Sequence, residues 1–160
     1  MPNYAGSQLD VLADLHLGAR VDRTAAKVAA ATVNLFTVAG GRVLLTGFLG
    51  EIVVAIAATA CTILVEALTT DVTAVVTPLC IAGSDIQSLA AGRMITLPAA
   101  VGSVMTLSTG SSAAIFTAAP WYVLKTGGLQ LTGSGAPATG TVKWSVWYVP
   151  IDPGAYMAAA

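Results

Sequence analysis

The stretch from Glu51 to Thr77 constrains the fold most, because its 27 consecutive residues include neither glycine nor proline. Length alone would favour a helix there, yet 15 of the 27 residues are Val, Ile or Thr. Branching at Cβ restricts these side chains in a helix and suits them to the pleated surface of a sheet. The stretch therefore predicts three strands, near 51–57, 60–68 and 71–77.

Thr141–Val149 has the clearest alternation of apolar residues in the chain. A strand with this pattern would place four apolar side chains on one face, namely Val142, Trp144, Val146 and Tyr148. Its second face would carry Trp147 and Val149, and this is more apolar than a surface in water needs to be. We expect a second sheet to cover one face and a neighbouring chain to cover the other. Pro150 and Pro153 would end the strand, since proline has no N–H to donate.

Glycine and proline interrupt the rest of the chain too often for long helices. The pairs Gly40-Gly41 and Gly127-Gly128 each separate two apolar segments, which predicts two hairpins. The segments that they join are 34–39 with 42–49 and 121–125 with 129–132.

The remaining segments are less regular. Gly133–Gly140 has no periodicity and is predicted to be a loop. One short helix is expected at Asp85–Ala91, because Ser84 or Asp85 would cap it, whereas residues 24–33 fit either a helix or a strand. Together these patterns predict an all-β fold, an antiparallel β-sandwich or a jelly roll.

Charged residues are concentrated at the beginning of the chain, where six of the fifteen lie within the first 27 residues. This predicts an extended N-terminal arm over residues 1–26 and a β-sandwich domain over 27–160 with a short C-terminal tail. A short amphipathic turn of helix is expected in the arm from four leucines, namely Leu9, Leu12, Leu15 and Leu17. Such an arm is either a solvated terminus or a segment that lies on a partner chain.

Composition excludes several classes of protein. Hydrophobic residues make up 56% of the chain and charged residues only 9%, whereas an average soluble domain is about 25% charged. Disordered chains have the opposite composition, so this chain is expected to fold. The net charge of −1 gives no electrostatic basis for binding nucleic acid or an anionic membrane surface.

The apolar surplus does not predict a membrane span either. The longest uncharged run of the most apolar region, Ile52–Val65, has 14 residues, and a helix needs ~20 to cross a bilayer. No basic residue precedes Arg20, so the start of the chain lacks the pattern of a secretory signal. We therefore expect the apolar residues to be buried against other protein chains, as they are in obligate interfaces.

The sequence offers no recognisable catalytic, cofactor or metal site. His16 is the only histidine and lies in the expected arm, where a general base would be poorly positioned. Cys61 and Cys80 have 18 residues between them, which does not fit a zinc site. They would be two buried thiols or a disulfide. Gly133-Ser134-Gly135 is not followed by Gly-Lys and precedes a strand, so it lacks the features of a phosphate-binding loop.

Two segments resemble a known group of proteins. They are FTVAGGRVLLTGFLGEI (Phe36–Ile52) and TVKWSVWYVPIDPGAYMAA (Thr141–Ala159). Both are similar to small Ala/Thr/Val-rich virion proteins of tailed bacteriophages, although Pro153 stands where that group usually has a polar residue. The resemblance implies a non-enzymatic capsid decoration or cement protein on the head surface of the virion. It also implies a homo-oligomer, most commonly a trimer, that contacts the major capsid protein.

Two functions are thus expected from the sequence. The first is capsid decoration by self-association, and the alternative is a neck, tail or fibre-associated β-sandwich that binds a host surface glycan or protein. The aromatic residues expected at the surface support the alternative. The residues expected at an interface are Trp121, Tyr122, Trp147, Val149, Arg20 and Arg23.

Overall fold

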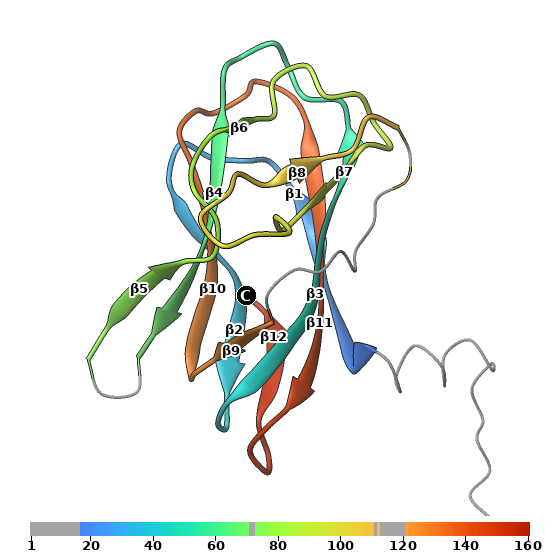
Figure 1. The fold of residues 1–160 in the computed structure, drawn as a ribbon. Coiled ribbons are helices and arrows are strands. Elements are labelled where there is room, and N and C mark those ends of the chain that lie inside the picture. Colours follow the sequence, from blue (N-terminus) through green and yellow to red (C-terminus); the bar gives the residue numbers. More distant parts are fainter. Residues whose placement is uncertain (1–16, 71–72, 111, 113–120) are drawn as a thin grey trace, which may run out of the picture.

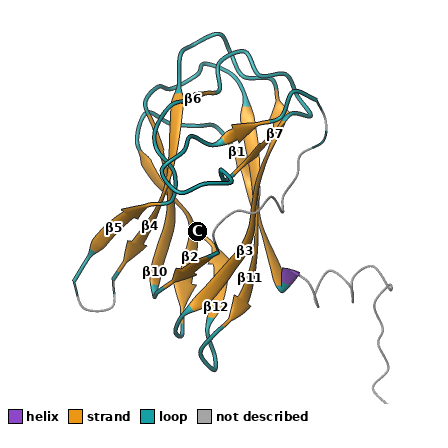
Figure 2. Ribbon diagram, viewed as in Figure 1, coloured by secondary structure: helices purple, strands orange, loops and turns teal. Residues whose placement is uncertain are grey.

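The computed structural model describes residues 17–70, 73–110, 112 and 121–160, and these form an all-β fold. Two antiparallel sheets of six strands each pack face to face, with the apolar core between them (Figure 1). Strands run through most of the sandwich and loops gather at its upper end (Figure 2). The predicted antiparallel β-sandwich is confirmed.

We call the two layers sheet A and sheet B. Sheet A has the order β1 (Ala19–Ala26), β11 (Thr141–Pro150), β3 (Val43–Val54), β7 (Met94–Thr96) and β8 (Thr106–Leu107), and β9 (Tyr122–Leu124) also pairs with β3. Sheet B has the order β12 (Tyr156–Ala159), β2 (Thr32–Ala39), β10 (Gly127–Gly133), β4 (Thr62–Thr69) and β5 (Val75–Pro78), and β6 (Ser84–Asp85) also pairs with β4.

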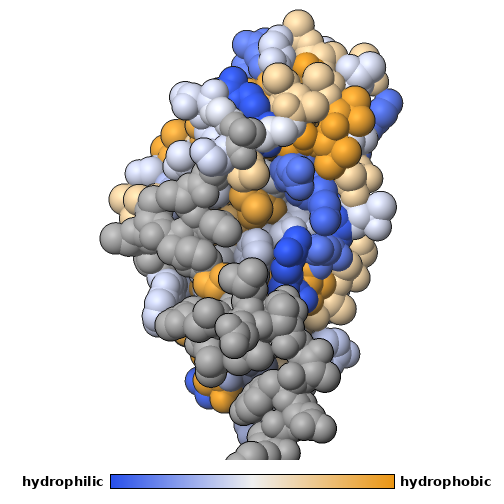
Figure 3. Space-filling model, turned by 90° about the vertical axis from the view of Figure 1, so that its right-hand side faces the viewer, coloured by the Kyte–Doolittle hydropathy of each residue, from blue (hydrophilic) through white to orange (hydrophobic). Residues whose placement is uncertain are grey.

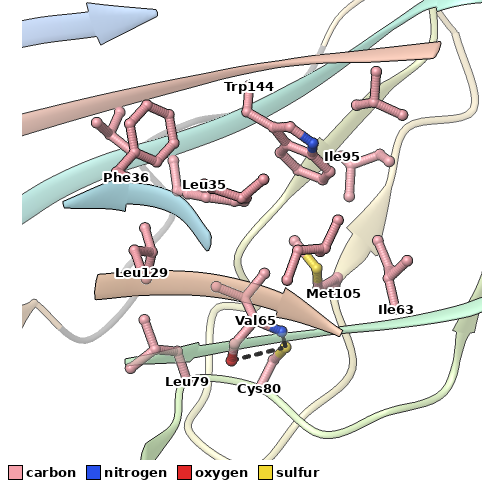
Figure 4. Packing of buried hydrophobic residues seen from close by; sticks show 14 of the residues in the cluster. Leu35, Phe36, Ile63, Val65, Leu79, Cys80, Ile95, Met105, Leu129 and Trp144 are labelled. Carbon is pink, nitrogen blue, oxygen red and sulfur yellow. Dashed lines mark hydrogen bonds between the residues drawn. The ribbon is translucent and has the colours of Figure 1, made fainter. Parts of the chain in front are cut away.

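The core is built from the inward faces of the central strands. The alternation predicted for Thr141–Val149 is confirmed in β11, whose four inward side chains are buried: Val142, Trp144, Val146 and Tyr148. The Trp144 ring extends from sheet A toward the side chains of sheet B (Figure 4) and its centroid lies 5.1 Å from that of Phe48. Tilted aromatic pairs of this kind add to the stabilisation from burial.

Both predicted hairpins are wrong, because the two segments on either side of each glycine pair lie in different sheets. β2 belongs to sheet B and β3 to sheet A, so the turn at Gly40-Gly41 crosses the sandwich. Likewise β9 lies in sheet A and β10 in sheet B. Gly40 has φ +74° and lies against the Gly154 carbonyl, so a Cβ there would clash. Close approach of the backbone, rather than a two-residue hairpin, requires this glycine.

Two further local predictions are corrected. No helix forms at Asp85–Ala91, because Ser88 has φ +56°, which a right-handed helix does not allow. The Asp85 carboxylate accepts 3.0 Å bonds from the backbone N–H groups of Gln87 and Cys61. These bonds tie the segment to the start of β4. The strands predicted at 42–49 and 51–57 are one continuous strand, β3, which passes through Gly50.

The ends of the chain also differ from the expectation. Residues 19–26, expected in the arm, form β1 and pair with β11 at the edge of sheet A. The ambiguous segment 24–33 contains no helix: β1 ends at Ala26, β2 begins at Thr32, and residues 27–31 connect them. Residues 156–159, expected as a tail, form β12 and pair with β2. Leu9, Leu12, Leu15 and His16 lie outside the described residues.

Candidate interaction surface

A cleft of about 420 Å³ opens on one side of the sandwich, between β4 and β5 of sheet B and β9 of sheet A. Its lining is mostly apolar and consists of Arg42, Ala67, Leu68, Thr69, Thr77, Leu79, Tyr122, Val123, Leu124, Lys125 and Gly128. The ionisable side chains among these described lining residues are Arg42, Tyr122 and Lys125. The cleft is large enough for a small apolar ligand or for several side chains of another protein.

Tyr122 links the two sheets across this cleft. It lies on β9 in sheet A, and its hydroxyl donates a 2.9 Å hydrogen bond to the carbonyl of Leu79, which follows β5 of sheet B. Burial raises the pKa of the Tyr122 hydroxyl, and the nearby Cys80 raises it further. Tyr122 is therefore a half-buried structural residue whose polar end already has a partner.

Uncovered apolar side chains gather around the cleft. Trp121 is 71% exposed, and Val123, two residues later, is also exposed. Across the cleft, all four residues of β5 are exposed, and they include Val75 and Val76. β5 pairs with β4 on one edge, and within the described residues its other edge carries no strand. We call Val75, Val76, Trp121 and Val123 the open side.

The open side has the features that make sheet edges associate. Figure 1 shows β5 and the end of β4 projecting away from the body of the sandwich. β5 has the sequence Val-Val-Thr-Pro and carries no charge. Apolar edge strands with unpaired backbone groups are templates for contact with another chain, and proteins usually protect them with charged residues. Only Pro78, which cannot donate a backbone hydrogen bond, provides such protection here.

Trp147 is more deeply buried within its own chain than the sequence suggested. Trp147 lies on the outer face of sheet A as expected, but its side chain is only 7% exposed. The ring packs over Gly47 of β3, and the Arg20 guanidinium lies 5.2 Å from its centroid. Arg20 also forms a 2.8 Å ion pair with Asp22. Residues of this chain therefore provide cover that was expected from a neighbour.

The same outer face is largely polar around β1 and β11. Asp22 accepts a 2.7 Å hydrogen bond from the Ser145 hydroxyl and lies 3.4 Å from the Lys143 ammonium group. Although partial burial raises the pKa of Asp22, these partners and Arg20 together hold it below its ordinary value. Figure 3 shows this side of the molecule, with a strip of hydrophilic residues beside apolar ones.

The remaining predicted interface residues lie apart from one another. Val149 is exposed on the outer face of sheet A, at the next-to-last position of β11. Arg23 donates a 3.2 Å hydrogen bond from Nε to the Ala160 carbonyl and so joins β1 to the end of the chain. The six predicted residues therefore do not form one surface, and only Trp121 and Tyr122 lie beside the cleft.

Sequence reasoning predicted a strand near 71–77, where β5 lies, but missed the exposure of β5 and the Arg42–Asp152 pair. Asp152 accepts bonds of 2.8, 2.9 and 2.7 Å from the backbone N–H, Nε and Nη2 of Arg42. These bonds lower the pKa of Asp152 to about 2. Arg42 and Asp152 are 110 residues apart in the sequence, so no local pattern predicts that they pair. The exposure of β5 was equally hidden, because its composition matches that of buried strands.

Neither thiol forms part of a site. Cys61 and Cys80 are free and buried, so the structure does not pair them. The Cys61 thiol lies 3.2 Å from the Gly135 carbonyl, and Cys80 contacts the backbone of Val65 (Figure 4). Burial raises the pKa of both thiols. Within the described residues, no three His, Cys, Asp or Glu side chains are grouped to hold a metal ion.

In the same part of the chain, no helix is long and apolar enough to cross a membrane. No protein-family model matches the sequence, and no curated protein or solved structure shows significant similarity to it.

Proposed function

We propose that this chain is a non-enzymatic structural protein of a virion, a capsid decoration or cement protein that associates with itself and with the major capsid protein. The open side is the observation that carries the proposal. Four apolar side chains flank an apolar cleft there, beside an uncharged strand edge. A chain with only 9% charged residues gains most by burying such a surface against other chains.

Self-association would stabilise a shell by burying apolar area across several subunits. Each Å² of apolar surface removed from water contributes about 25 cal/mol before the costs of association. The resemblance of Phe36–Ile52 and Thr141–Ala159 to phage decoration proteins favours a trimer, with the major capsid protein as the second partner. The head surface of the virion is the corresponding location.

The test compares two valine variants in the full chain. Val76→Lys places a charge on the open side, whereas Val53→Lys places the same charge on β3 at matched exposure, 49% against 47%. We expect the unmodified protein and Val53→Lys to sediment as oligomers and to co-sediment with shells of the major capsid protein. Val76→Lys should lose both properties while keeping its circular dichroism spectrum. An unmodified protein that remains monomeric and does not bind shells would refute the proposal.

The alternative is a neck, tail or fibre-associated module that binds a host glycan or protein. Trp121 favours it, because a 71% exposed indole is a typical stacking platform for a sugar ring. Copy number separates the two functions, since decoration needs hundreds of copies per particle and a fibre component needs far fewer. A stained gel of purified virions measures this ratio, and a glycan array with Trp121→Ala as its control tests the binding.

A further inference from the structure

An apolar row crosses the outer face of sheet A near the C-terminal end of β11. Val149 of β11 lies opposite Leu44 of β3, and Leu44 lies opposite Val123 of β9. Residues that face each other on adjacent strands share one face of the sheet. Their chain neighbours Tyr148, Leu45 and Leu124 point into the core and are buried. We call Val149, Leu44 and Val123 the outer row.

The first described residues of the chain already lie on this row. Gly18 packs against β11 so closely that a Cβ there would contact the Tyr148 carbonyl and lie 2.8 Å from Val149 Cγ2. The next residue toward the N-terminus, Leu17, accepts a hydrogen bond on its carbonyl from the hydroxyl of Thr46 on β3. From Gly18 to Leu17 the chain thus moves from β11 toward β3, along the direction of the row and toward Val123.

Residues 1–16 have the length and composition to continue in this direction. The three strands of the row are ~10 Å across, whereas 16 residues span ~24 Å as a helix and about 50 Å when extended. The segment includes Leu9, Leu12 and Leu15, whose spacing of three residues places them on one side of a helical turn.

The charges of the segment also fit this end of the sheet. Residues 1–16 contain Asp10 and Asp14 but no lysine or arginine. Extending the antiparallel register of β3 and β9 by one pair beyond Val43 and Leu124 brings Arg42 opposite Lys125. Both cations line the cleft beside β9. The two aspartates of the segment are opposite in sign to the two cations at this end of the sheet.

From these observations we infer that residues 1–16 dock in the same molecule as a strap across the outer row. The leucines cover Leu44 and Val123, and the two aspartates lie near Arg42 and Lys125. Tethering favours the chain's own segment over that of a second copy, because it begins on the row itself and is present at high effective concentration. The strap would remove Val123 from the open side and leave Val75, Val76 and Trp121 for self-association, so the inference does not require the proposed function.

Thiol labelling tests the strap directly. Cys61 and Cys80 are buried, so a cysteine introduced by Val123→Cys would dominate alkylation of the folded protein. We expect it to react at least about fivefold faster when residues 1–16 are removed, because the strap then no longer protects it. Val76→Cys on β5 is the matched control, and its rate should not change. Equal rates for Val123→Cys with and without residues 1–16 would overturn the inference.

Two further variants of the full chain make the test independent of truncation. Leu12→Asp with Leu15→Asp should raise the labelling rate of Val123→Cys as the deletion does, and an unchanged rate would overturn the inference. Oxidation of Leu12→Cys with Val123→Cys should give a disulfide within one monomer on a non-reducing gel. Disulfide-linked dimers at low protein concentration would show docking on a second copy and would overturn the assignment to the same molecule.

Discussion

Trp144 packs directly against the backbone of Gly50, its partner across the β11–β3 pair. A Cβ at position 50 would lie within 3 Å of the indole atoms Cε3 and Cη2. Gly50 therefore leaves room for the Trp144 ring, the largest fully buried side chain of the core. The indole fills the space that a side chain on β3 would otherwise occupy.

We expect both residues of this pair to be sensitive to substitution. Trp144→Ala should lower the free energy of unfolding by about 3–5 kcal/mol, because it leaves a cavity between the sheets. Gly50→Ala should cost about 1–3 kcal/mol, because the added methyl group displaces the ring. Urea denaturation followed by circular dichroism measures both. The exposed Trp121→Ala is the control and should stay within about 0.5 kcal/mol of the unmodified protein.

Trp147 gives a second prediction, since its ring lies over Gly47 and beneath Arg20. Trp147→Ala should destabilise the monomer by about 1–3 kcal/mol, whereas a residue that served only an interface would leave the monomer unchanged. Arg20→Ala should cost about 0.5–1 kcal/mol, the usual size of an exposed cation–π contact. Denaturation at concentrations where the protein is monomeric separates the two roles. An unchanged midpoint for Trp147→Ala would mean that the ring is not packed within its own chain.

The sequence was most informative where a pattern is local. The inward face predicted for β11 is present in the structure because side chains alternate between the two faces of any strand, although Ser145 and Trp147 on the outer face are buried as well. The break expected at Gly50 did not occur, because the absence of a side chain there is compensated by Trp144 from another strand. A single sequence does not reveal such a pairing across nearly a hundred residues.

Sheet membership and exposure were not predictable in the same way. A glycine pair between two apolar segments has the same local signal for a hairpin as for a turn that crosses the sandwich, as at Gly40-Gly41. Val75 and Val76 have the composition of a buried strand, and only the position of β5 at the edge of sheet B exposes them. The candidate surface therefore became visible only with the tertiary structure.

The two thiols should be unreactive in the folded protein. Both are buried, and burial raises the pKa of each, which keeps them protonated near neutral pH. A chromogenic disulfide reagent at pH 8 should detect almost no thiol in native protein and both thiols after addition of denaturant. Rapid reaction of either cysteine in the native protein would contradict the packing of that residue.

The Arg42–Asp152 pair should make the free energy of unfolding depend on pH in the acid range. The folded-state pKa of Asp152, about 2, lies below the ordinary value of 3.8 because Arg42 stabilises the carboxylate. The unfolded chain therefore binds a proton more readily, so this contribution is present above pH ~4 and is lost as the pH falls toward 2. NMR titration of the carboxyl carbon should show the low midpoint in the unmodified protein. Arg42→Gln should raise the midpoint toward the ordinary 3.8 without reaching it, because the backbone N–H of residue 42 still donates to Asp152. An unchanged midpoint would exclude the Arg42 side chain as the cause.

Tyr122→Phe tests the hydrogen bond that joins the sheets. Removing the hydroxyl leaves the Leu79 carbonyl without this donor and should cost about 1 kcal/mol, whereas Tyr156→Phe at the exposed edge should cost nothing measurable. Because folding raises the pKa of Tyr122, its contribution is complete below pH ~10 and declines as the pH rises through the folded-state value. Urea midpoints measured from pH 8 to 11 should therefore converge for the unmodified protein and Tyr122→Phe. A gap that stays constant or widens over that range would show that the hydroxyl does not hold its proton more tightly in the folded state.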